Sequence, residues 1–195
     1  IELGCARVTV NRALRTLAEI CLLDRRRKAG TRVALHPVRK ATLSIPLIRS
    51  EIEASGKSYG YHLLSQQTEP APAPVTQKFA LANNTQLLHV VALHEADGDP
   101  FVIEDRWINS SIMPHLADVS FTELSANEWL LQNTPFTHGD IDFGAKNASQ
   151  REAELLATKP DKALFVISRT TWDQTTAVTM VDLVFHAGHR KHTRL

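Results

Sequence analysis

The sequence predicts an α+β fold in which an antiparallel sheet is flanked by short helices. Three observations lead to this fold class. Segments of strand length alternate with turn signals through most of the chain, and the DGDP stretch at residues 97–100 is a strong hairpin signal. Two Ser-x-x-Glu capping boxes, Ser125 with Glu128 and Ser149 with Glu152, each begin a short helical segment between strands. Strands joined by turns, with helices between them, are typical of antiparallel α+β domains.

Each element follows from a local pattern of apolar spacing and turn residues. Gly56 ends the first helix of this part, and the prolines of residues 70–74 close the strand that follows it. In chain order, the expected elements are a helix at 45–56, a strand at 59–69, a helix at 74–81, two strands around the turn within 85–110, a helix at 124–133, a strand at 138–146, a helix at 149–158, and strands at 163–172 and 176–186.

The amino-terminal part has a different character. Residues 5–19 predict a helix with one apolar stripe, formed by Val10, Ala13, Leu14, Leu17, Ala18 and, just beyond it, Cys21. The outward side near the start of this helix carries short polar and basic side chains of the kind that meet phosphates and base edges in a major groove. These residues are Arg7, Thr9, Asn11 and Arg12. A solvated basic face is the alternative interpretation of the same pattern.

The charge distribution supports contact with a polyanion in this part only. The whole chain has a net charge of +1, from 22 basic and 21 acidic side chains. Residues 1–40 hold 10 of the basic and 3 of the acidic residues, so the remainder holds 12 basic and 18 acidic residues. A basic head on an acidic body indicates a polyanion partner for the head only.

A basic hairpin follows the helix, because residues 22–34 (LLDRRRKAGTRVA) predict two short strands around a turn that contains Gly30. Helix and hairpin together resemble the second half of the winged helix-turn-helix of GntR-family repressors. The family's recognition-helix pattern is matched by Arg7, Thr9, Val10, Ala13 and Leu14, although Ala6 replaces its serine. The family's Gly-x-Gly-Thr wing is present as KAGT at residues 28–31, and Cys21 replaces a glycine before the wing strand.

The resemblance implies a partial DNA-binding domain at residues 1–38. It places Arg7, Thr9, Asn11 and Arg12 near the bases of an operator, and the wing residues Arg26, Arg27, Lys28 and Gly30 at the backbone. Two helices precede this stretch in the family, so we expect the chain to be part of a longer protein. A two-fold operator also implies a homodimer.

The body, residues 43–195, follows a proline-containing linker at 34–43 and resembles the UTRA effector domain of one branch of the GntR family. The motifs that carry this resemblance are the Asp97-Gly98-x-Pro100 turn, Glu104, the INSSIMP stretch with Pro114, and RTTW at residues 169–172. Within the family, EDRWIN at residues 104–109 and the RTTW motif are most similar to histidine-utilisation repressors. The resemblance implies a transcriptional repressor that a small molecule controls.

Five residues are candidates for binding that molecule. The family's pocket glutamate corresponds to Glu104, and strand alternation places Arg106 on the same face. The Arg-x-Arg pair of the family's sugar-phosphate sensors is replaced by Ala92 and His94, which argues against a dianionic ligand. A monocarboxylate would need only one arginine, such as Arg106 or Arg169, with the amides at the start of the Ser125 helix. Urocanate, an imidazole acid, is the effector that the resemblance implies; the candidate residues are His94, Glu104, Arg106, Ser125 and Arg169.

Structural interpretations of the same residues stay open from the sequence alone. Glu104 and Arg106 could be an exposed cross-strand pair, and Arg169 could face solvent. His94 could be a structural histidine, and Trp107 and Trp172 are expected in the core rather than as stacking platforms. Another small acid or a sugar phosphate is the alternative ligand. Because the UTRA fold resembles that of chorismate lyase, an enzyme is a further alternative, although the sequence offers no catalytic residues.

Composition limits the remaining possibilities. The chain has 43% apolar residues, enough for a sizeable core, and no run of about 20 apolar residues that could span a membrane. Cys5 and Cys21 do not form a disulfide or zinc pattern, and three-residue steps of His186, His189 and His192 fit a helix better than the strand expected there. We therefore expect a cytoplasmic protein without cofactor or metal and without contact with a membrane.

Overall fold

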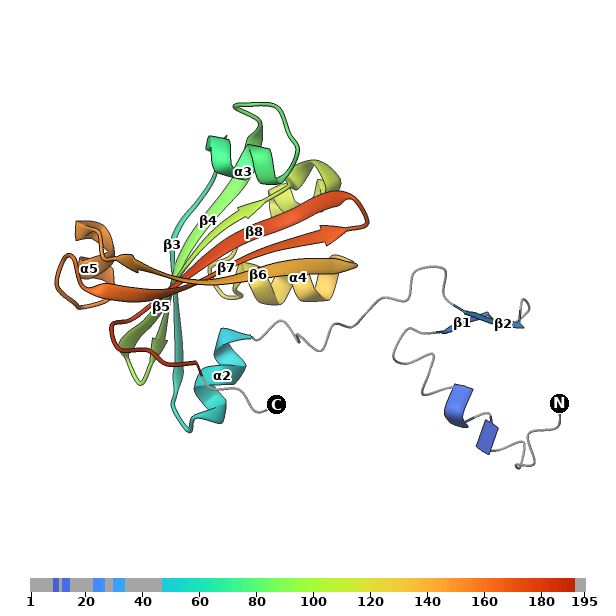
Figure 1. Cartoon of the computed structure of the whole chain (residues 1–195), viewed down its shortest axis with the longest axis horizontal. Coiled ribbons are helices and arrows are strands. Elements are labelled where there is room, and N and C mark those ends of the chain that lie inside the picture. The colour runs from blue at the N-terminus through green and yellow to red at the C-terminus, as the bar shows by residue number, and fades with distance from the viewer. Residues whose placement is uncertain (1–8, 11, 15–22, 27–29, 34–46, 192–195) are drawn as a thin grey trace. The chain divides into compact units, whose positions relative to one another are not determined.

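The computed structural model describes residues 9–10, 12–14, 23–26, 30–33 and 47–191, and the chain divides into two units, Ile1–Ile45 and Pro46–Leu195 (Figure 1).

In the first unit, residues 9–10 and 12–14 are helical. Strand β1 (Leu23–Arg26) pairs with the antiparallel strand β2 (Gly30–Val33), as expected for the basic hairpin. Gly30 is the first residue of β2, opposite Arg26, and not part of the turn, so that detail of the prediction is wrong. Four of the predicted DNA-contacting residues lie outside the described residues: Arg7, Asn11, Arg27 and Lys28.

The second unit is built on a six-stranded sheet in the order β3-β4-β5-β8-β7-β6, and every neighbouring pair is antiparallel. The predicted α+β class is therefore confirmed. The strands are β3 (Tyr59–Pro70), β4 (Gln86–Ala96), β5 (Asp99–Ile108), β6 (His138–Asn147), β7 (Ala163–Asp173) and β8 (Thr176–Phe185).

Short helices connect the strands (Figure 1). Both predicted capping boxes are formed, since the serine hydroxyl accepts the backbone N–H of Glu128 in one helix and of Glu152 in the other. The helices are α2 (Ile48–Ala54), α3 (Ala73–Lys78), the 3-10 turns η1 (Ser110–Ile112) and η2 (Pro114–Asp118), α4 (Ala126–Asn133) and α5 (Gln150–Leu155).

The β4–β5 hairpin is tighter than the sequence suggested. Its turn consists of Asp97 and Gly98, both at positive φ (57° and 83°), which is the backbone of a two-residue hairpin turn. Asp97 tolerates this conformation because its carboxylate accepts hydrogen bonds from the N–H and the hydroxyl of Ser58. Pro100 lies within β5, opposite Glu95, beside a register shift.

The two faces of the sheet carry different cores. One face holds two apolar clusters, the first packed with α4 and η2 around Phe121 and Leu116, and the second packed with α2 around Ile52 and Phe185. The opposite face packs against α3 through Phe79 and against α5. Between the two clusters of the first face, a stretch of sheet carries polar side chains.

Candidate functional site

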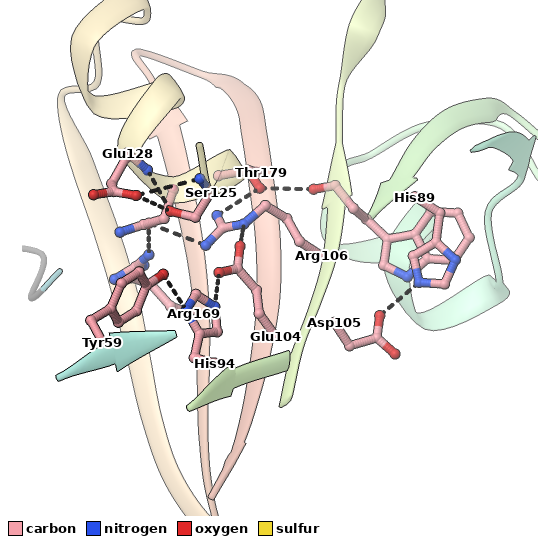
Figure 2. A network of polar contacts seen from close by, with 12 residues as sticks. Tyr59, His89, His94, Glu104, Asp105, Arg106, Ser125, Glu128, Arg169 and Thr179 are labelled. Carbon is pink, nitrogen blue, oxygen red and sulfur yellow. Dashed lines mark hydrogen bonds and ion pairs between the residues drawn. The ribbon is translucent and has the colours of Figure 1, made fainter. Parts of the chain in front are cut away.

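Four of the five predicted effector-binding residues meet on this stretch of the sheet. His94 comes from β4, Glu104 and Arg106 from β5, and Arg169 from β7; all four are at most 5% exposed. The interpretations of Glu104 and Arg106 as an exposed pair and of Arg169 as solvent-facing are therefore wrong. Figure 2 shows this group, with His89 and Asp105 on the other side of β5.

Glu104 is the centre of the group. One of its carboxylate oxygens accepts a hydrogen bond from Arg106 Nε at 2.5 Å, and the other lies 3.0 Å from His94 Nε2. Burial alone would raise the pKa of Glu104, but the charge of Arg106 and the two hydrogen bonds lower it to about 2. Glu104 is therefore ionised and already engaged through both oxygens.

His94 links Glu104 to two tyrosines of the edge strand β3. Its Nδ1 lies 2.8 Å from the hydroxyl of Tyr59, and the ring of Tyr61 meets it edge-on at 5.3 Å. Both ring nitrogens of His94 are therefore engaged, Nδ1 with the hydroxyl of Tyr59 and Nε2 with the carboxylate of Glu104. The buried hydroxyl of Tyr61 has no hydrogen-bond partner. Burial raises its pKa, so it remains a donor.

The two guanidinium groups lie in one row of the sheet. Val181 of β8 is the register partner of both Arg106 and Arg169, so it separates them. Asn127 of α4 bridges the two groups, because its side-chain oxygen accepts from Arg106 Nη2 at 3.1 Å and from Arg169 Nη2 at 2.6 Å. Arg106 also donates to the hydroxyl of Thr179 at 3.3 Å.

Arg169 is the least compensated charge of the site. Its Nε is buried without a hydrogen-bond partner. Burial and the nearby charge of Arg106 lower its pKa to about 9, and Glu104 opposes this only in part. Two guanidinium groups and one carboxylate give the group of Glu104, Arg106 and Arg169 a formal charge of +1. A buried site with one excess positive charge suits a monoanion.

Ser125, the fifth predicted residue, lies next to the group but contacts Glu128 and not the guanidinium groups. It is the buried N-cap of α4, and its hydroxyl donates to Glu128 at 2.9 Å and accepts from the Glu128 N–H. Among residues 47–191, no hydrogen bond joins the Ser125 hydroxyl to the guanidinium groups. Sequence reasoning missed Asn127, which does contact them. Its signal was its position, the second residue of a helix whose amino end was expected at the site.

A second histidine group lies on the opposite face. His89 bonds Glu69 at 2.6 Å and Asp105 at 2.8 Å, and it stacks on Trp107 at 4.1 Å. Burial lowers the pKa of His89, but the two carboxylates outweigh it and the net shift is upward. Trp107 and Trp172 pack partly against the core as predicted, yet each also stacks on a histidine, His138 in the case of Trp172. A hollow of roughly 200 Å³ lies beside this group, next to α5.

Thr9 and Arg12 are exposed, and Arg26 and Gly30 lie at the adjoining ends of β1 and β2. His186 and His189 pack against Phe101, and His192 lies outside the described residues. In the described part of the chain, no cluster of three or more His, Cys, Asp or Glu is placed to hold a metal ion, and no helix has the length and apolar character of a membrane span.

Comparison with known proteins agrees with this architecture. Residues 54–191 match the UTRA domain. The chain belongs to the UTRA-domain family of transcriptional regulators. It is 32% identical to the histidine utilization repressor of Pseudomonas putida over 189 residues, which are 97% of this chain and 76% of that protein. It is 26% identical to a probable fructoselysine utilization operon transcriptional repressor of Shigella flexneri, over 97% of this chain and 78% of that protein.

Solved structures of transcriptional regulators have the same fold. The C-terminal domain of the histidine utilization repressor from Pseudomonas syringae pv. tomato aligns with a TM-score of 0.66 and 25% identity, over 71% of this chain and 99% of that domain. PhnF from Mycobacterium smegmatis aligns with a TM-score of 0.69 and 22% identity, over 98% of this chain and 85% of that protein, and shares the fold.

Proposed function

We propose that this UTRA protein is a ligand-responsive transcriptional repressor of histidine utilisation whose effector is urocanate. Its body, residues 43–195, binds the effector, and residues 1–38 belong to the domain that binds operator DNA in the cytoplasm. The relatives named histidine utilization repressors support this assignment. The buried excess positive charge, centred on Arg169, carries the choice of ligand class.

The charge of the site favours a monocarboxylate over a sugar phosphate. Arg169 Nε has no hydrogen-bond partner, so one oxygen of an incoming carboxylate can accept from it while the other accepts from the adjacent Nη2. One carboxylate neutralises the +1 charge of the group, whereas a phosphate dianion would leave a buried negative charge. β4 supplies no further guanidinium group to offset it, since Ala92 and His94 stand where the sugar-phosphate sensors carry arginine.

The imidazole of urocanate needs a different partner from the one expected. Glu104, the only carboxylate among the candidate residues, is already engaged by Arg106 and His94 through its two oxygens. The buried, unpartnered hydroxyl of Tyr61 lies beside His94 and can donate to an imidazole nitrogen. We therefore assign the carboxylate of urocanate to Arg169 and its ring to the surroundings of Tyr61 and His94, with Glu104 holding Arg106 and His94 in place.

We also propose that the protein binds a two-fold operator as a homodimer. Arg7, Thr9, Asn11 and Arg12 would face the bases, and the wing residues Arg26, Arg27, Lys28 and Gly30 the backbone. Arg7→Ala should relax the sequence preference, whereas Arg27→Ala should weaken binding to all DNA alike. Light scattering of residues 43–195 should report a dimer.

Calorimetry tests the ligand. Urocanate should bind the wild type, and Arg169→Met should weaken binding at least a hundredfold because it removes the charged partner. Lys146→Met, which removes a cation elsewhere in the same unit, should bind normally. Tight binding of glucosamine phosphate with no heat from urocanate would contradict the assignment. Product formation from candidate acids would instead favour the chorismate-lyase-like alternative.

A further inference from the structure

Helix α2 is the first element of the second unit after residues 34–46, through which the chain arrives from the DNA-binding part. Two of its residues, Ile48 and Ile52, are buried in the apolar cluster beside the effector site. Any change in the position of α2 is therefore passed directly into the segment that joins the two units. The contacts that hold α2 against the body therefore determine whether effector binding can influence that segment.

Two side chains of α2 make polar contacts with other parts of the unit: Glu51 pairs with Lys191, and Arg49 contacts the elements around the site. Its Nε donates to a Glu128 carboxylate oxygen at 2.8 Å, across 79 residues of sequence. Its guanidinium group also lies over the ring of Tyr59, 4.3 Å from the centroid. The hydrogen bond to Glu128 is the largest cause that raises the pKa of Arg49, so the side chain is charged when it makes both contacts.

Both partners of Arg49 are one contact away from the effector site. Glu128 follows Asn127, whose side-chain oxygen accepts from both guanidinium groups, and it is fixed in the capping box of Ser125. Tyr59 bonds His94, the neighbour of Glu104. A single side chain of α2 therefore contacts the two elements, α4 and β3, that enclose the site.

Asn127 is the point at which a ligand would act on this arrangement. A neutral amide oxygen is a weaker partner for a guanidinium group than a carboxylate. Arg169 Nη2 now donates to the side-chain oxygen of Asn127 at 2.6 Å. A ligand carboxylate that binds Arg169 through Nε and Nη2 competes with Asn127 for this donor. Loss of that bond releases the first turn of α4, and with it Glu128.

We propose that Arg49 couples effector binding to the DNA-binding part, through its contacts with Glu128 and Tyr59. The inference rests on the proposed function for the identity of the effector. Binding of the carboxylate moves Asn127 and the amino end of α4, and Arg49 transmits this movement to α2. Arg49 is a positioning residue, since it contacts no ligand-binding donor directly.

The test compares operator binding of the natural full-length protein with and without urocanate, in the wild type, Arg49→Met, Arg49→Lys and Lys146→Met. Met keeps the length of the side chain without its charge. Lys146 is the matched control, because it pairs with Glu152 in the capping box of α5 just as Arg49 pairs with Glu128 in that of α4. Calorimetry with urocanate is run on the same variants.

Urocanate should weaken operator binding of the wild type and of Lys146→Met at least tenfold, within the usual range of allosteric coupling. In Arg49→Met the effect should fall below twofold, although urocanate affinity stays within about threefold of the wild type. Arg49→Lys should restore part of the coupling. Full coupling in Arg49→Met, with normal urocanate binding, would overturn the inference.

A ligand-free measurement separates failure of this inference from failure of the proposed function. Amide hydrogen exchange of α2 is compared in Asn127→Ala and in Asn127→Ala with Arg49→Met, each against its own background. Asn127→Ala should accelerate exchange in α2 at least threefold when Arg49 is present, and not when it is replaced. An equal effect in both backgrounds, or none in either, would refute the coupling even if urocanate proves to be the wrong ligand.

Discussion

Replacing Glu104 with Gln tests the electrostatic centre of the site. The shift of its pKa from 4.5 to about 2 corresponds to roughly 3 kcal/mol of preference for the ionised form. Gln keeps the shape but leaves the buried Arg106 without a counterion, so unfolding free energy at pH 7 should fall by about 3 kcal/mol, a cost typical of a broken buried pair. Urea unfolding followed by tryptophan fluorescence measures the loss.

The same substitution predicts a change in the acid profile. A carboxylate with a lowered folded-state pKa stabilises the protein above its ordinary pKa of 4.5, and this stabilisation is lost as pH falls toward about 2. The stability difference between wild type and Glu104→Gln should therefore shrink between pH 5 and pH 2. Glu123→Gln, at an exposed position, is the control and should follow the wild type. A loss below about 1 kcal/mol at pH 7, or parallel acid profiles, would refute the reasoning.

Three further predictions follow from single contacts. Tyr61→Phe should weaken urocanate about tenfold in calorimetry without lowering thermal stability, since the hydroxyl has no partner within the protein. His89→Gln should lower the free energy of unfolding by about 1 kcal/mol at pH 6, and by less at pH 9, in thermal unfolding. The raised pKa of His89 stabilises the folded protein below pH 6.5, and this stabilisation is lost as pH rises through the raised value. Ser125→Ala and Ser149→Ala should each cost about 1 kcal/mol of stability, but only Ser125→Ala should also weaken urocanate; equal effects on binding would contradict the placement of Asn127.

Local patterns in the sequence were sufficient for most elements of the body. The capping boxes, the β4–β5 hairpin and the alternation along β5 each depend on residues close in sequence, and each is present. The alternation also placed Glu104 and Arg106 on one face correctly. The details that failed, such as the exact turn at Asp97 and Gly98, depend on single backbone angles that several turn types can satisfy.

The partners within the site could not be predicted in the same way, because they depend on strand order and register. Glu104 is paired with Ala92 across the β4–β5 ladder, so its bond to His94 is a diagonal contact that needs the register to be known. Arg169 reaches the row of Arg106 only because β8 lies between β5 and β7. A register shift in β3 between Leu63 and Ser65 is likewise a tertiary feature with no local signal.

The two capping boxes are alike in sequence but differ in their tertiary surroundings. Ser125 with Glu128 and Ser149 with Glu152 have the same pattern, the same backbone geometry and the same glutamate hydrogen bonds. Each glutamate also pairs with a cation, Arg49 in α4 and Lys146 in α5. Their surroundings differ, because α4 packs on the face that carries the two buried guanidinium groups, whereas α5 packs on the opposite face.

The second residue after each N-cap serine differs between the two helices. Asn127 of α4 contacts two guanidinium groups through its side-chain oxygen. In α5 the corresponding position is Arg151, which is exposed. Under the proposed coupling, the same capping motif only stabilises α5 but makes α4 responsive, because an effector carboxylate would compete for the guanidinium groups that Asn127 contacts.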